Sequence, residues 1–262
     1  MKYQNPNEEI RRIILETAAA YDERPDTESR RREPLVAFAD AKDPLFAELK
    51  TIVSPTHALP EEIIPDAKTV ITFFLPFDEK TVKSNIDGAD SSREWNIANI
   101  EANELIIAVN EALHAYFTGE GFHSSLLPPT YHYDEVNLRS DWSHKSAAYI
   151  SGLGTFGLNQ LLITEKGCCG RFGSVITDMD MEHTPRIEGE YCLFKAKGNC
   201  KKCVKRCPAA ALNEGYERFR CNDQIYGKPI PTYPKGTGDA CGKCMCDVPC
   251  AMENPVKEGK KQ

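Results

Sequence analysis

The sequence contains no long hydrophobic run. Its longest apolar stretches, such as Val70–Leu75 and Leu105–Val109, are far shorter than the roughly 20 residues that a transmembrane helix needs. The first residues also lack the apolar segment of a signal peptide, so we expect a cytoplasmic protein with no membrane partner. We also find no internal repeat and no low-complexity segment. The sequence has no P-loop and no Ser-His-Asp pattern, so nothing in it indicates a P-loop nucleotide-binding protein or a serine hydrolase.

The composition is that of a globular protein with one exception, its cysteines. The 262 residues are 41% hydrophobic and 27% charged, which predicts a sizeable core and either one large domain or two modest ones. The chain has 11 cysteines. In a reducing compartment they are not expected to form a disulfide framework, so metal binding or redox chemistry becomes the leading interpretation.

Cysteines and positive charge gather in the same part of the chain. From Tyr191 onward there are 14 Lys and Arg against 7 Asp and Glu, whereas the preceding residues carry 18 against 32. We prefer charge compensation of anionic iron–sulfur clusters over a nucleic-acid patch as the reason. The change in composition predicts a cofactor- or substrate-binding domain over residues 1–189 and a ferredoxin-like domain over residues 190–262. Nine cysteines lie in this last third: Cys192, Cys200, Cys203, Cys207, Cys221, Cys241, Cys244, Cys246 and Cys250.

Helix and strand signals alternate in the first domain. Asn5 and Pro6 predict the start of a helix, and residues 69–75 read as a buried strand in the centre of a sheet. Apolar residues at spacings of three and four predict a long helix over 102–116. Residues 161–164 and 174–177 read as a hairpin around a glycine-rich turn. We therefore predict an α+β chain with an N-terminal α/β domain.

The segment Cys200-x2-Cys203-x3-Cys207-Pro208 is typical of bacterial ferredoxins with two [4Fe-4S] clusters. In those proteins the cysteine before proline ligates the other cluster, so a second cysteine set must follow, and it does. A short helix is expected over residues 208–212. By analogy with the crosswise pattern, the first cluster takes Cys192, Cys200, Cys203 and Cys250, and the second takes Cys207, Cys221, Cys241 and Cys244.

Alternatives to this assignment remain. Cys246 can replace Cys244 or Cys250 as a ligand, and paired CxxC elements also build structural zinc sites. We favour iron–sulfur clusters over zinc, because the crosswise ferredoxin pattern accounts both for the proline after Cys207 and for two sets of four cysteines. A zinc ribbon accounts for neither. Cys168 and Cys169 are interpreted as free thiols at the tip of the expected hairpin.

Residues 152–157 match the dinucleotide-binding pattern GxGxxG, and Asp178 follows at a plausible distance for a ribose-binding acid. The context argues against a dinucleotide site, because such a motif follows a strand and opens a helix. Here residues 146–150, before the motif, look helical, and residues 161–164, after it, look like a strand. We interpret the motif as a helix-to-strand turn whose bare backbone lets a cofactor or another part of the chain approach closely.

Together, residues 146–159, residues 171–178 and the eight proposed ligand cysteines resemble the epoxyqueuosine reductase family and its reductive-dehalogenase relatives. The resemblance implies a nitroreductase-like domain joined to a two-cluster ferredoxin domain. It further implies electrons passing through two [4Fe-4S] clusters to a cobalamin held near the glycine-rich turn, with flavin as the second choice. The cofactor-binding residues implied are Gly152, Gly154, Gly157 and Asn159.

The sequence departs from that family in two places. The family's Asp-Tyr-His element, which supplies a catalytic acid, is replaced by Ser92-Arg93-Glu94-Trp95-Asn96, and the C-terminal helical repeats are missing, as in a short form. Glu94 could replace the acid if its side chain faces the pocket. A carboxylate in the first turn of a helix is explained equally well by its favourable interaction with the helix dipole. A tRNA substrate suits the acidic first domain poorly, so nucleic acid is not an expected partner.

Polar and aromatic residues cluster ahead of the glycine turn, at 131–134 and 141–145, and His57 lies further upstream. Such groups line cofactor pockets and relay protons, but for any single one we favour an ordinary loop or a hydrogen-bonded core histidine.

The function we expect is an iron–sulfur oxidoreductase that passes single electrons to a cofactor or small-molecule substrate, with a redox partner protein as donor. The alternative is a non-enzymatic electron-transfer protein. The catalytic residues stay unassigned.

Overall fold

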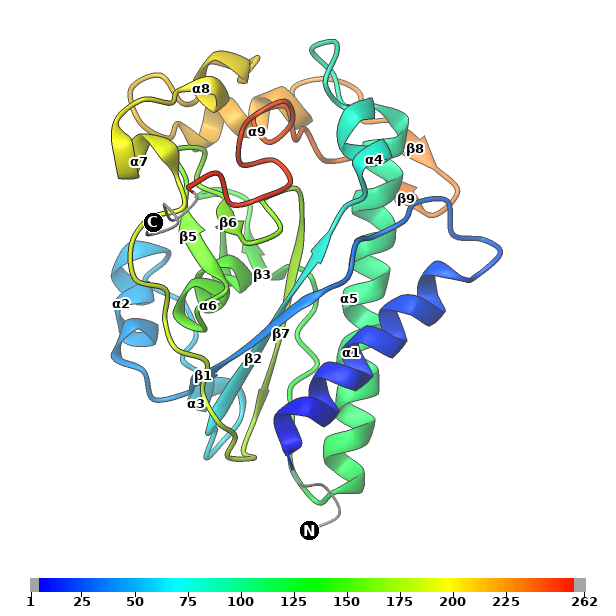
Figure 1. Cartoon of the computed structure of the whole chain (residues 1–262), viewed down its shortest axis with the longest axis vertical. Helices are drawn as coiled ribbons and strands as arrows, with labels where there is room; N and C mark the ends of the chain where they lie inside the picture. The colour runs from blue at the N-terminus through cyan, green and yellow to red at the C-terminus, as the bar shows by residue number, and fades with distance from the viewer. Residues whose placement is uncertain (1–4, 257–262) are drawn as a thin grey trace, which may run out of the picture. The chain divides into compact units, whose positions relative to one another are not determined.

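The computed structural model describes residues 5–256 (Figure 1). These residues divide into two compact units. The first unit consists of the described residues up to 75, with 101–153 and 171–186. The second consists of residues 76–100, 154–170 and those from 187 onward. The predicted boundary between residues 189 and 190 falls close to the start of this last segment. Two earlier segments nevertheless belong to the second unit.

The first unit begins with helix α1, Pro6–Asp22, at the predicted position. The Asn5 side chain accepts a hydrogen bond from the Asn7 backbone N–H at 3.0 Å, and Pro6 occupies the first helical turn, where its missing N–H costs nothing. Ile10, Ile14 and Ala18 then form the buried face of the helix.

A three-stranded sheet in the order β1-β2-β7 forms the centre of the first unit. Strand β1, Leu35–Asp40, runs antiparallel to β2, Thr69–Pro76, with Leu35 opposite Phe74 and Asp40 opposite Thr69. Every residue of β2 is buried, which confirms the prediction of a central strand. Strand β7, Gly170–Thr177, lies on the other side of β2.

Helices cover both faces of this sheet. On one face α1 and α5, Arg93–Gly119, pack against the side chains of Phe38, Phe73 and Val175. On the other face α2, Pro44–Ile52, and α6, His144–Ile150, pack against the alternate side chains of the strands. The unit is completed by three short elements: α3, Pro60–Ile63; β3, Tyr131–Asp134; and β4, Arg139–Trp142, which pairs antiparallel with β3.

The second unit is built from short elements. It contains α4, Glu79–Ser84, the first turns of α5, and an antiparallel pair of β5, Gly154–Phe156, with β6, Leu162–Thr164. The remaining elements are α7, Leu193–Lys197; α8, Lys202–Arg206; α9, Arg218–Tyr226; β8, Thr232–Tyr233; and β9, Gly236–Thr237. No helix within residues 5–256 combines the length and apolar character needed to cross a membrane.

Two local predictions are wrong. The expected hairpin does not form, because β6 pairs with β5 and β7 joins β2 instead. The short helix expected over residues 208–212 is a series of turns in which Ala210 has a φ of 51°. The helix of this region, α8, lies before Cys207.

Candidate functional site

Four cysteines of the second unit line one cavity. Cys192 precedes α7, Cys200 and Cys203 flank the start of α8, and Cys250 lies in the final turns of the described chain. All four lie at a single cavity with the apolar side chains of Ile163, Leu193 and Val248. These are the cysteines that the sequence assigns to the first cluster.

The electrostatics of Cys203 reflect this grouping. Burial and the nearby sulfurs of Cys250, Cys192 and Cys200 raise the pKa of Cys203 to about 11. The thiolate form of Cys203 is therefore disfavoured when it stands alone, and a cationic metal centre would remove that penalty by binding it.

Cys244 has the other three cysteines of the second set as electrostatic neighbours, together with Cys203 of the first set. Burial, followed by Cys241, Cys221 and Cys207, raises the pKa of Cys244. The backbone N–H of Ala211 donates to the sulfur of Cys207 at 3.3 Å, and Tyr216 is hydrogen-bonded to Cys221. Hydrogen bonds of this kind stabilise thiolate ligands.

Both sets fit [4Fe-4S] clusters in the chemistry of their donors, because each offers four cysteine sulfurs. Within residues 5–256, no group of three or more His, Cys, Asp or Glu side chains is arranged to hold a single metal ion. A cubane makes a different demand, since each of its four thiolates binds a separate iron.

The three remaining cysteines are buried together. Cys168 and Cys169 are free cysteines, as predicted, but they do not lie at a hairpin tip, and their side chains are only 1% and 0% exposed. They follow β6 in a turn that lies against the Cys250 segment, with the Cys168 N–H donating to the Cys250 carbonyl at 2.9 Å. Cys246 is also fully buried and contacts Cys169. Cys246 does not line the cavity of the first set, and it shares Asn85 and Lys243 as neighbours with Cys241 of the second set.

The glycines of the 152–157 motif are needed for close chain packing. Gly152 has a φ of 84°, and a Cβ there would lie 2.4 Å from the Pro185 carbonyl oxygen. A Cβ on Gly154 would lie 2.0 Å from the Ile163 carbonyl oxygen. Because the motif runs from α6 into β5 and opens no helix, the structure excludes the dinucleotide reading.

The other predicted cofactor residues lie beside the first cysteine set. Gly157 and Asn159 line the cavity that holds Cys192, Cys200, Cys203 and Cys250. The Asn159 side-chain amide also donates to the Cys244 carbonyl at 3.2 Å. The turn after β5 therefore contacts segments that carry ligands of both proposed clusters.

The two histidines singled out in the sequence, His57 and His144, have structural partners. His144 is buried, with Nδ1 2.8 Å from Ser174 Oγ and Nε2 3.0 Å from the Pro128 carbonyl oxygen, and burial lowers its pKa to about 4. His57 accepts from the Ser143 backbone N–H through Nε2 and bonds the Ala58 carbonyl through Nδ1. Both are hydrogen-bonded core histidines, as favoured from the sequence. Asp178 pairs with His123.

Sequence reasoning missed a buried lysine between two proposed ligands. Lys243, which is 1% exposed, donates to the backbone carbonyls of Asn85 at 3.1 Å and Asp87 at 2.7 Å. The Asn85 amide in turn donates to the Cys241 carbonyl at 3.0 Å and the Cys246 sulfur at 3.6 Å. Burial lowers the pKa of Lys243, while neighbouring Cys241 and Cys246 oppose this shift. The only signal in the sequence was a basic residue inside a CxxC.

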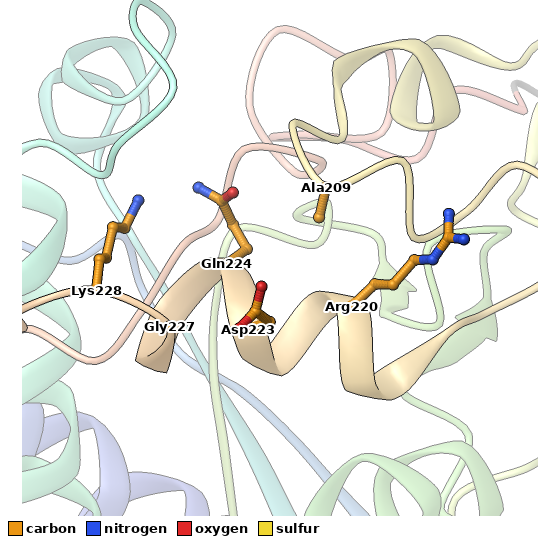
Figure 2. Close-up of a pocket in the computed structure, with 6 residues that line it drawn as sticks. All are labelled: Ala209, Arg220, Asp223, Gln224, Gly227 and Lys228. Carbon is orange, nitrogen blue, oxygen red and sulfur yellow. The ribbon is translucent and has the colours of Figure 1, made fainter.

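A shallow cavity lies along α9 (Figure 2). Arg220 and Lys228 stand at opposite ends of the row, with Asp223 and Gln224 between them. Its volume of about 220 Å³ is below the roughly 300–1,000 Å³ typical of cofactor sites. We therefore place no organic cofactor there.

No family model and no curated protein matches the sequence. Solved structures do match it. An epoxyqueuosine reductase from Streptococcus thermophilus is 14% identical over 98% of this chain and 69% of its own, with a TM-score of 0.55. Another epoxyqueuosine reductase, solved with an epoxyqueuosine-modified tRNA-Tyr stem loop, is 15% identical to this chain. The match covers 94% of this chain and 67% of the other, with a TM-score of 0.56. The chain has the epoxyqueuosine reductase fold.

The epoxyqueuosine reductase fold extends to a second group of structures. A catabolic reductive dehalogenase is 16% identical over 85% of this chain but only 30% of its own, with a TM-score of 0.52. The resemblance predicted from the sequence is therefore confirmed at the level of the fold.

The segment Ser92–Asn96, which the sequence comparison set against the catalytic acid of epoxyqueuosine reductases, lies at the start of α5. Ser92 accepts a hydrogen bond from the Trp95 backbone N–H at 3.1 Å, and Glu94 is exposed in the first turn of α5. A carboxylate at this position stabilises the helix dipole. Capping by Ser92 and the interaction of Glu94 with the helix dipole thus account for these two residues without a catalytic role.

Proposed function

We propose that the protein is an oxidoreductase whose second unit carries two [4Fe-4S] clusters. The first is held by Cys192, Cys200, Cys203 and Cys250, and the second by Cys207, Cys221, Cys241 and Cys244. The cavity shared by the first four cysteines carries this proposal, because they come from segments far apart in the chain and converge on one space. The fold of epoxyqueuosine reductase supports it.

The residues around the ligands perform three tasks. The apolar side chains of Ile163, Leu193 and Val248 limit the access of water to the first site. The Ala211 N–H stabilises the Cys207 thiolate, and Lys243 places a buried positive charge beside the second set. When bound, the clusters supply one-electron transfer.

Iron analysis tests this assignment. Protein purified without oxygen is expected to contain iron and sulfide in equal amounts and to show a broad visible absorption that bleaches on reduction. Zinc without iron or visible absorption would contradict the proposal. Replacing Cys203 by Ala is expected to remove the iron of one cluster. Cys246→Ala is expected to keep both clusters, since Cys246 neither lines the cavity of the first set nor is among the cysteines that raise the pKa of Cys244.

A corrinoid is the proposed electron acceptor, with flavin as the second candidate, and we assign its binding to the domain proposed over residues 1–189. The resemblance to epoxyqueuosine reductases and reductive dehalogenases supports this choice. The measurement is retention of cobalamin or flavin after anaerobic incubation and desalting. Retention of neither contradicts the cofactor assignment and favours the electron-transfer protein instead.

We propose a small-molecule substrate, with electrons supplied by a redox partner protein. One related structure holds a tRNA stem loop. In this chain, residues before Tyr191 carry 18 basic against 32 acidic side chains, which disfavours binding of phosphates. A tRNA stem loop is therefore expected to show no saturable binding at physiological salt. Tight, salt-dependent binding would contradict this part of the proposal.

A further inference from the structure

Exposed lysines gather on the segment that carries proposed ligands of both clusters. Residues 191–213 contain six basic side chains and no acidic one. This segment includes α7 and α8, drawn in yellow in Figure 1, and the cysteines at 200, 203 and 207. Five of the six basic residues are exposed lysines: Lys195, Lys197, Lys201, Lys202 and Lys205.

Two of these lysines have acidic neighbours, and three do not. Lys195 pairs with Glu190 at 3.9 Å, and Lys202 pairs with Asp247 at 3.8 Å. Within residues 5–256, the other three lysines form no ion pair. We call these three the lysine surface: Lys197, Lys201 and Lys205.

Compensation of cluster charge does not account for the lysine surface. That role suits basic groups held inside the unit, such as Lys243, which is 1% exposed, and Arg206, whose Nε donates to the Lys243 carbonyl at 3.1 Å. An exposed ammonium group stays hydrated, and salt at 0.1 M screens its field over about 10 Å. The lysine surface is therefore better suited to attracting a partner than to tuning a cluster.

The proposed ligands beside the lysine surface lie close to solvent. Cys200 and Cys203 alternate with its three lysines along the chain, and both cysteines are only partly buried. The ammonium group of Lys201 lies over the ring of Phe194 in α7, 5.1 Å from the ring centroid, so α7 and the start of α8 form one connected surface. A carrier that docks here comes close to a cluster held by these cysteines.

We propose that the lysine surface is the docking site of an acidic iron–sulfur carrier protein that reduces the clusters. This inference rests on the proposed function, which requires a redox partner as electron donor. Charge complementarity selects an acidic partner, because unpaired cations in a segment without acids attract carboxylates and repel a basic protein. One electron leaves the reduced iron–sulfur centre of the carrier and enters one cluster. No bond forms or breaks, and the oxidised carrier dissociates.

The test measures the second-order rate constant for reduction of the anaerobic, iron-loaded protein by a reduced, acidic plant-type ferredoxin. Lys197→Glu combined with Lys205→Glu is expected to lower this rate constant at least about tenfold at low salt, because electrostatic steering is lost. The wild-type rate constant is expected to fall as salt rises from about 0.01 to about 1 M, since the screening length shortens from about 30 to about 3 Å. Lys197→Gln with Lys205→Gln is expected to show a smaller loss, and it replaces the charge-reversed variant if that variant fails to fold.

Lys42→Glu combined with Lys80→Glu is the matched control, because it makes the same change in net charge at two exposed lysines outside the segment. Its rate constant with ferredoxin is expected to change less than about twofold. Photoreduced 5-deazariboflavin, which is neutral, is expected to reduce all variants at the wild-type rate. Iron content and midpoint potentials are expected to match the wild type as well.

Failure of ferredoxin to reduce the wild type, a wild-type rate constant independent of salt, or an equal loss in the control variant would overturn the inference. Saturable binding of a tRNA stem loop by the wild type but not by the Lys197 and Lys205 variant would overturn it too, since the lysine surface would then be a nucleic-acid site. Wild-type protein without iron would refute the clusters themselves. Clusters that 5-deazariboflavin reduces, with no effect of the lysine surface on the reaction with ferredoxin, would refute only the docking site.

Discussion

The first unit and the 187–256 segment of the second unit are stabilised in different ways. The first unit has two apolar clusters, one on each face of its sheet, with Phe38, Phe73 and Leu113 completely buried. In the 187–256 segment, α7 and α8 have five residues each. Apart from two cysteines, its buried apolar residues are Ala211, Leu212, Met245, Val248 and Ala251. A segment with so little core depends on other bonds for its structure.

Metal ligation supplies those bonds under the proposed function, so removal of iron is expected to have the largest effect. Chelation is expected to abolish amide hydrogen-exchange protection in α7, α8 and α9, because binding and folding are coupled where no preformed core exists. Protection of β2 in the first unit is expected to persist. Equal protection of α8 with and without iron would show that this contrast between the two regions is wrong.

A core substitution in the first unit is expected to have the converse effect. Phe73→Ala creates a cavity in the centre of the sheet and is expected to lower the free energy of unfolding by about 3–5 kcal/mol. Chemical denaturation followed by circular dichroism measures the change. The iron content and visible absorption of the folded variant are expected to match the wild type. Phe219→Ala, at a side chain 58% exposed, is the control and is expected to change stability by less than about 0.5 kcal/mol.

Acid is expected to weaken the first unit through His144. Its folded-state pKa of about 4 lies below the ordinary value of 6.5, so the unfolded chain binds a proton more readily between these values. The stability that neutral His144 contributes is complete above pH 6.5 and is lost as the pH falls toward 4, by about 3 kcal/mol at most. Unfolding curves recorded between pH 7 and 4 measure this loss. His144→Gln is expected to have a flatter stability profile, and an unchanged slope would exclude His144 as the cause.

The smallest expected effect concerns the buried charge in the second unit. Lys243→Gln removes a cation beside Cys241. It is expected to lower the midpoint potential of the second cluster by on the order of 59 mV, which corresponds to a tenfold change in the equilibrium constant for one-electron reduction. The first cluster, whose cavity has no charged side chain among its described lining residues, serves as the internal reference. Lys202→Gln, at an exposed lysine, controls for the change in net charge. A rise in the second potential would contradict the assigned role of Lys243.

Local patterns predicted the parts of the fold that depend on neighbouring residues. The cap at Asn5, the continuous apolar run of β2 and the helical periodicity of α5 each have a signal within a few residues. The hairpin prediction failed because sequence gives no direct signal for which distant strand completes a sheet, and β7 pairs with β2 about 100 residues upstream.

The candidate site shows the same limit. Cysteine spacing predicted which four residues share the first cavity, and the structure brings those four together, while their binding of iron stays a prediction. The burial of Cys168 and the contact of Lys243 with Asn85 arise between segments more than 80 residues apart. Such contacts have no local pattern, so they became visible only in the folded chain.

The crosswise arrangement has a consequence for biosynthesis. Cys192 and Cys250 face one cavity, and the second set spans Cys207 to Cys244, so each set becomes complete only when its last cysteine has left the ribosome. The first unit needs nothing beyond residue 186 and is free to fold earlier. Under the proposed function, iron would reach a chain whose first unit has already folded, before the Cys250 segment packs against the turn that carries Cys168.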